Sequence, residues 1–421
     1  MKWIFQVKDL RKKIIATLLL VLVYKFMSVI TIPGANPEGI SAMLSSEEWR
    51  GLAFFSALMG GWLERFSIIL MGLSPYINAL IIIQLLGVIV PKIGDLQKEG
   101  EQGQKTINKY TRWLTLPLAF LQSYGMIILL NTLSPVPVMD TSDTSTVVMA
   151  MVIITSATIF LMWLGEIMTE YGLGNGISII ITAWVLAWVP GVITGHIASG
   201  NYPLFSGLIL ATLLIIYIII KFTEGNRRIP LIYTRTGREE KSYFPIRVNQ
   251  AGMIPIIFAV SLVTFPAILG QILANASGTT ASAVGDFLLT HFSMANPGWV
   301  FIIVYFLLVL GFSFFYVSIT FNTDQVAENI QKRGGYIPGI RPGAETSEYL
   351  GKVSAHLNLF GGSFLALIAV LPYVMGKIPG IDQTVDFIIS GSGLIIIVSV
   401  ILDLIRRVDS EMKMFDYSKY K

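Results

Sequence analysis

Long apolar runs alternate with short polar and charged segments along the whole chain. Most of these runs approach the ~20 residues that a membrane-crossing helix needs. In chain order, the ten runs cover approximately residues 14–32, 52–90, 113–130, 147–164, 177–192, 204–220, 253–272, 299–319, 359–375 and 387–405. The pattern therefore predicts an all-α polytopic membrane protein with ten spans.

The second run, 52–90, is interrupted in its middle. The sequence Gly72-Leu73-Ser74-Pro75 ends one helix and allows another to begin, because proline lacks a backbone donor and clashes with the preceding turn. The part before the break carries Glu64, Arg65 and a glycine pair, so it is a poor span. A broken helix persists at membrane depth only where protein or a water-filled cavity covers its backbone. We therefore expect this stretch to line something other than lipid.

Composition and charge support a membrane protein and orient it. Only 13% of the 421 residues are charged, against about a quarter in soluble chains. If the N-terminus is cytoplasmic, 26 of the 30 Lys and Arg residues fall on inner segments, as the positive-inside rule requires. An even number of spans then places both termini in the cytoplasm. The basic N-terminus leads into a run that has no cleavage site before Pro33, so we expect this first helix to be retained.

Two inner loops, about 222–249 and 322–356, are long enough to have structure of their own. In the first, 231–234 and 242–246 are predicted to be short strands with a turn at Thr236-Gly237. The second is rich in glycine and proline. The outer stretches 132–145 and 275–297 lack basic residues and are expected to be plain surface connectors.

Little catalytic or ion-coupling chemistry is present. The chain has no cysteine and three scattered histidines, so a metal centre is not predicted. Carboxylates cluster at the ends of the spans, and Lys25 is the clear charged residue inside one; its long stem can reach water or meet a loop carboxylate. Several isoleucine triplets (81–83, 179–181 and 395–397) are either ordinary lipid-facing and core residues or members of a dewetted apolar constriction.

Five motifs resemble the SecY family, the central protein-conducting channel subunit of the Sec translocase, and they follow one another over the whole chain. They are SPYINALIIIQLL, FLMWLGEIMTE, GLGNGISIII, VNQAGMIPIIFA and GIRPG. The resemblance implies two inverted, pseudo-symmetric halves, 1–200 and 201–421, which are hinged between spans 5 and 6 around a central pore. It also implies a passive channel, not an enzyme and without a cofactor. Such a channel passes unfolded secretory polypeptides across the bacterial plasma membrane and releases apolar segments into lipid through a lateral gate.

The resemblance also implies particular sites and partners. The plug that blocks the closed pore is a short half-helix at about 52–66, which contains Phe54, Phe55, Ser56, Leu58, Gly60, Gly61 and Trp62. The pore ring is formed by Leu73, Ile77, Ile177, Ile181, Ile257 and Ile396. The lateral gate lies between spans 2 and 7, with candidate polar residues Asn78, Gln122, Asn249 and Gln250. The residues expected to contact the ribosome or the SecA ATPase are Arg235, Arg238 and Arg341. Further implied partners are SecE, SecG, signal-bearing polypeptides and the lipid bilayer.

An apolar ring suits a channel for polypeptides. Leu73 and Ile77 are four residues apart, as are Ile177 and Ile181, so each pair lies on one helical face. Branched apolar side chains bind no segment of a passing chain strongly, and a narrow apolar neck excludes water and ions.

Three alternatives remain open from sequence. A secondary transporter also has broken helices, and Lys25 is its candidate midplane site. An enzyme within the membrane would need a metal cluster, a Ser-His pair or paired aspartates, and none is recognisable at span depth. The four amides proposed for the gate would equally suit helix-bridging residues of a membrane core.

Overall fold

Ten long helices correspond one by one to the ten predicted runs. The computed structural model describes residues 8–45, 66–198, 202–235, 238–274, 279–292, 297–375, 377 and 391–419. The ten helices are α1 (Lys8–Met27), α4 (Ser74–Ile89), α6 (Glu101–Leu133), α7 (Thr144–Tyr171), α8 (Gly176–Ala198), α9 (Tyr202–Glu224), α10 (Ile254–Ala274), α12 (Trp299–Thr320), α14 (Ala344–Met375) and α16 (Gly391–Lys419). Within the described part of the chain, α6, α7, α12 with its continuation to Lys332, and α14 are by themselves long and apolar enough to cross a membrane.

The predicted break before α4 is confirmed. Gly72 has a positive φ of 51°, Leu73 is the N-cap residue, and Pro75 lies in the first turn of the helix. The segment before the helix is held by backbone hydrogen bonds to the end of the first span: the Ile32 N–H donates to the Phe66 carbonyl at 3.0 Å, and the Ile68 N–H donates to the Ile30 carbonyl at 2.9 Å. The break therefore fixes where α4 begins. The predicted plug residues at positions 54–62 lie outside the described residues.

The structure also contains short helices that the apolar runs did not predict. They are α2 (Pro37–Ser45), α5 (Pro91–Lys98), α11 (Thr279–Phe292) and α13 (Thr323–Lys332). The outer stretch 275–297, expected to be a surface connector, contains α11, which packs tightly on α10. A Cβ on Gly285 would lie 2.3 Å from the backbone nitrogen of Ala274. The inner loop 322–356 contains α13 and the first three turns of α14. The apolar runs did not predict these helical turns because the turns are polar and lie outside the predicted spans.

The two predicted strands are confirmed and are longer than expected, whereas the predicted turn at Thr236-Gly237 lies outside the described residues. Strand β1 (Asn226–Arg235) pairs antiparallel with β2 (Arg238–Arg247), from Asn226 opposite Arg247 to Arg235 opposite Arg238. A third strand, β3 (Gly335–Tyr336), pairs with β1 from the other inner loop, and it was not predicted. Ile229, Leu231 and Ile246 are buried there together with Ile330, Ile337 and Leu350. The two inner loops thus form one small unit.

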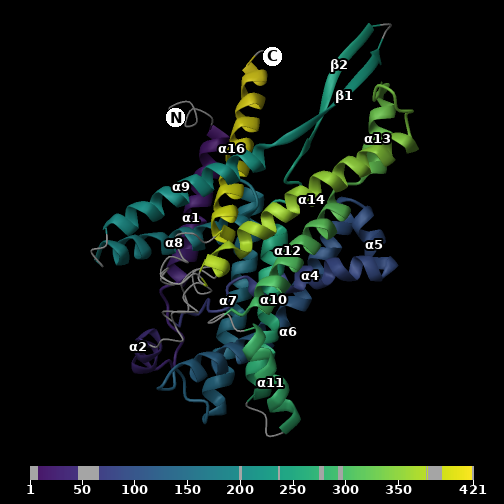
Figure 1. Cartoon of the computed structure of the whole chain (residues 1–421). Coiled ribbons are helices and arrows are strands. Elements are labelled where there is room, and N and C mark those ends of the chain that lie inside the picture. The colour runs from purple at the N-terminus through teal and green to yellow at the C-terminus, as the bar shows by residue number, and fades with distance from the viewer. Residues whose placement is uncertain are drawn as a thin grey trace.

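The hairpin, the N-terminal end of α1 and the C-terminal end of α16 lie at the same end of the bundle (Figure 1). We call this the hairpin end. α1 and α16 lie beside α8 and α9 on one side, whereas α4, α10, α12 and α5 lie on the other. The two sides of the bundle therefore contain different helix pairs.

Candidate functional site

The six residues predicted to form the pore ring belong to one apolar cluster. Leu73, Ile181 and Ile396 are buried, with exposed fractions of 0%, 5% and 5%. The partly buried members that pack against the same cluster are Ile77, Ile177 and Ile257. They come from the start of α4 and from α8, α10 and α16, which are far apart in sequence. All six therefore lie in one large apolar core, which also contains residues of α1, α6 and α7.

Local interactions set the position of Ile177 at the start of α8. The side-chain oxygen of Asn175 accepts the N–H groups of Ile177 at 3.1 Å and Ser178 at 3.2 Å, so it caps the helix. On the facing helix, a Cβ at Gly165 would lie 3.1 Å from Cγ1 of Ile177. Glycine at 165 thus leaves the space that the isoleucine occupies. Sequence reasoning missed this role because the glycine stands twelve residues away on another helix.

The predicted gate amides do not all lie between the same helices. Asn78 of α4 accepts a hydrogen bond from the Ser261 hydroxyl of α10, so this pair crosses the predicted gate. Gln122 of α6 is 7% exposed, and its Oε1 has no hydrogen-bond partner among the described residues. Asn249 and Gln250 precede α10; Asn249 Oδ1 accepts the Gly252 N–H at 2.9 Å.

The polar contacts of Gln250 and its neighbours extend toward α14. Gln250 Oε1 accepts the Ser354 hydroxyl at 2.9 Å, and Asn358 Oδ1 accepts the Ser313 hydroxyl of α12 at 2.8 Å. These contacts are of the kind expected if the amides are helix-bridging residues of a membrane core, which is the alternative to a role in the gate. Asn358 was not predicted, although a buried amide in an apolar helix is a signal that could have identified it.

The basic residues predicted to contact partners lie on the unit at the hairpin end. Arg235 and Arg238 face each other across the last register position of the hairpin, at its tip. The Arg341 side chain is 88% exposed and lies 3.8 Å from Glu345. The hairpin of β1 and β2 projects beyond the helix bundle (Figure 1). The exposed guanidinium of Arg341 suits binding to phosphates or acidic proteins.

The structure weighs against the site that a transporter would need. Lys25 lies in the last turn of α1, away from the hairpin end, and its side chain is exposed. It is therefore not buried in the interior of the helix bundle. Among the described residues, no group of three or more His, Asp or Glu side chains is arranged to hold a metal ion.

Carboxylates on the connector that precedes α7 have lowered pKa values. The Asp143 side chain accepts hydrogen bonds from the Thr146 and Ser145 hydroxyls, which are the main cause of its lowered pKa. It also caps α7 through the Ser145 N–H at 3.0 Å.

At the other end of this helix, Arg112 of α6 forms a two-bonded ion pair with Glu166, with both N–O distances at 2.8 Å. This ion pair links α7 to α6.

The family model for SecY matches residues 67–405. The translocase subunit SecY of Halalkalibacterium halodurans is 37% identical over 427 aligned residues, which cover 97% of this chain and 96% of the relative. The same subunit of Corynebacterium glutamicum is 36% identical over 431 residues, covering 98% and 97%.

Solved channel structures share the fold. A SecY structure that describes the plug domain aligns with a TM-score of 0.67 at 18% identity, over 95% of this chain and 92% of that chain. Sec61 from a canine ribosome–channel complex aligns with a TM-score of 0.63 at 16% identity, over the same shares of 95% and 92%. At these identities the likeness concerns the fold alone.

Proposed function

The chain belongs to the SecY family of protein translocase subunits, and from this premise we propose how its own residues form the channel. It is a multi-pass membrane protein of a channel family, not of an enzyme family. In the proposal, the cluster around Leu73, Ile181 and Ile396 is the neck of the pore. The observation that supports this assignment is that six branched side chains from four separate parts of the chain belong to, or pack against, the same apolar core cluster.

The physical role of the neck follows from its chemistry. Every side-chain type passes through such a channel, so a charged lining would retain some segments. Branched apolar groups bind none of them strongly, and water in a narrow apolar neck is unstable, so ion leak is slow. The segment 52–66 is proposed as the plug that seals the neck from outside.

The lateral gate is proposed at the contact between α4 and α10. The Ser261–Asn78 hydrogen bond crosses this contact, and hydrogen bonds between membrane helices contribute only about 0.6 kcal/mol on average. An interface of this strength can part to release an apolar segment into lipid. Residues 1–200 and 201–421 are proposed as the two halves that separate there.

Orientation and partners are part of the same proposal. We place both termini and the hairpin in the cytoplasm of a bacterium, because 26 of the 30 basic residues fall on that side. The exposed Arg341 and the hairpin tip then face the ribosome or SecA. SecE and SecG are proposed as the membrane partners of this chain. Two solved relatives, canine Sec61 and yeast Ssh1, are in complexes with ribosomes.

A triple substitution of the neck tests the pore assignment. Replacing Ile77, Ile181 and Ile396 with asparagine should admit water and raise ion leak through the reconstituted complex. A barrier lowered by about 1.4 kcal/mol would already raise the leak about tenfold. The matched control replaces the same residues with leucine, which keeps the neck apolar and should leave the leak low. Unchanged leak and export in the asparagine variant would refute the pore assignment.

A further inference from the structure

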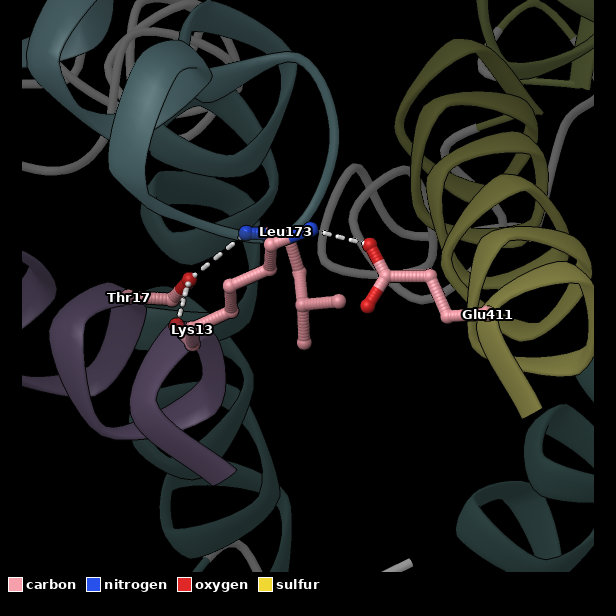
Figure 2. A network of polar contacts seen from close by, with 4 residues as sticks. All are labelled: Lys13, Thr17, Leu173 and Glu411. Atoms are coloured by element: carbon pink, nitrogen blue, oxygen red, sulfur yellow. Dashed lines mark hydrogen bonds and ion pairs between the residues drawn. The ribbon is translucent and has the colours of Figure 1, made fainter. Parts of the chain in front are cut away.

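At the hairpin end, the turn between α7 and α8 lies between α1 and α16. The Leu173 N–H donates a hydrogen bond to the Thr17 hydroxyl of α1 at 3.0 Å, and that hydroxyl donates to the Lys13 carbonyl at 2.8 Å. The Lys13 ammonium forms an ion pair with Glu411 of α16. Figure 2 shows this continuous path from the turn through α1 to α16, which we call the clasp (Lys13, Thr17, Leu173 and Glu411).

Glycines let the turn approach both helices closely. A Cβ on Gly172 would lie 2.7 Å from the Thr17 hydroxyl oxygen, so a side chain there would displace the α1 contact. Gly174 has a φ of 91°, which side chains other than glycine rarely adopt. Its Cβ position lies 3.5 Å from side-chain atoms of Leu404 and Arg407, so the turn also contacts α16 directly.

The clasp connects two helices that carry the neck. The Thr169 hydroxyl donates to the Gly165 carbonyl and accepts the Gly176 N–H, both at 2.8 Å, which fixes the first residue of α8. Ile177 follows immediately. On the other side, Ile396 belongs to the same helix as Leu404, Arg407 and Glu411. A change in the clasp would therefore shift the start of α8 relative to α16, and with them two members of the neck.

We infer that the clasp is a fixed joint that holds the α8 and α16 parts of the neck in register while α4 and α10 part. This inference rests on the proposed function, because it assigns one side of the bundle to the moving gate and the other to a stationary contact. Thr17, Lys13 and Glu411 are then positioning residues, since they act on the neck through α8 and α16 and do not face it themselves.

Covalent bridging tests whether the clasp stays closed during transport. The chain has no cysteine, so Lys13→Cys with Glu411→Cys can be joined by a short bismaleimide, and Asn78→Cys with Ser261→Cys can be joined by the same reagent. Export is measured in membrane vesicles that contain the complete translocase. We expect the bridged clasp to keep export within about twofold of the unbridged protein, and the bridged gate to lose it.

The outcomes distinguish failure of the fixed joint from failure of the proposed gate. Loss of export on bridging the clasp, with the unbridged double variant active, would overturn the fixed joint and leave the channel assignment intact. Full export with α4 and α10 bridged would overturn the proposed gate, whatever the clasp does.

Charge reversal tests whether the clasp positions the neck. Glu411→Lys alone should raise ion leak about two- to fivefold, the size expected for a partly exposed ion pair. The double reversal with Lys13→Glu restores the attraction and should return the leak to its original level. Thr17→Val should raise the leak, whereas Thr17→Ser keeps the hydroxyl and should not. Equal leak in all these variants would overturn the positioning role.

Discussion

The α4–α10 contact and the clasp are built from different interactions. α4 and α10 meet through apolar side chains and the Ser261–Asn78 hydrogen bond. The clasp combines a hydrogen bond from a backbone N–H, a charge pair, and two glycines at which an added Cβ would meet side chains of α1 and α16. Opening the clasp would require several polar contacts to be lost together, whereas the hydrogen bond across the α4–α10 contact is of a kind that contributes about 0.6 kcal/mol. The difference supports the proposal that the α4–α10 contact opens while the clasp stays closed.

The largest effect is expected from filling a close backbone contact at the start of α8. A Cβ on Gly176 would lie 2.1 Å from the Gly165 carbonyl oxygen, so Gly176→Ala forces α7 and α8 apart at the start of α8. Overpacking commonly costs about 1–3 kcal/mol, and a rigid backbone neighbour places this substitution at the upper end. Thermal unfolding of the purified complex in detergent would measure the loss.

The matched control for this substitution is Gly311→Ala in α12. Nothing lies within 4 Å of the Cβ position at Gly311, so the added methyl group meets no neighbour. It should be neutral or stabilising by about 0.4–1 kcal/mol. Equal stability of the two variants would contradict the view that the start of α8 is held by backbone contact.

A smaller effect is expected at the gate. Ser261→Ala removes the donor to Asn78, which should favour the parted state about threefold, since such bonds average about 0.6 kcal/mol. The measurement is the fraction of an apolar test segment released into lipid, with Asn78→Leu and the double variant as a cycle. The double variant should resemble either single variant, because the two residues act as one pair. Additive effects would show that they act separately.

The smallest effect concerns Asp143, on the connector before α7. Hydrogen bonds from Thr146 and Ser145 lower its pKa below 3.8, so this carboxylate stabilises the folded state at pH values above 3.8. That contribution is lost as the pH falls from 3.8 through the lowered pKa. Asp143→Asn should weaken this acid dependence of unfolding without changing export at neutral pH. A changed export rate would mean that the connector takes part in gating.

Much of the fold could be predicted because a helix that crosses a bilayer needs a long run of apolar residues, and such runs are visible in the sequence. The ten runs, the break at Gly72 and the strands around 231–234 and 242–246 each follow from a local signal. The strand at Gly335–Tyr336 was missed because it depends on pairing with β1, which is distant in sequence. The turns of α14 before residue 359 and the helix at 279–292 were missed because neither forms a long apolar run.

Some residues of the candidate site could likewise be identified from the sequence, and others could not. The ring residues were grouped by family resemblance, and composition alone gave no reason to choose Ile181 or Ile396 over other isoleucines. The roles of Gly165 and Thr17 depend on contacts between helices that no spacing along the chain reveals. Conversely, the amides at 249 and 250 were assigned to the gate, and the Gln250 side chain bonds to α14 instead of crossing the α4–α10 contact.

The most direct test of the channel is to ask whether a polypeptide in transit touches the neck. A secretory chain with one cysteine is stalled partway through export, and single cysteines are placed at Ile77, Ile181, Ile396 and, as a control, at the exposed Ile218 of α9. After oxidation, we predict disulfide adducts at the three neck positions and none at the control. Continued export without adducts at the neck would show that the polypeptide takes another path.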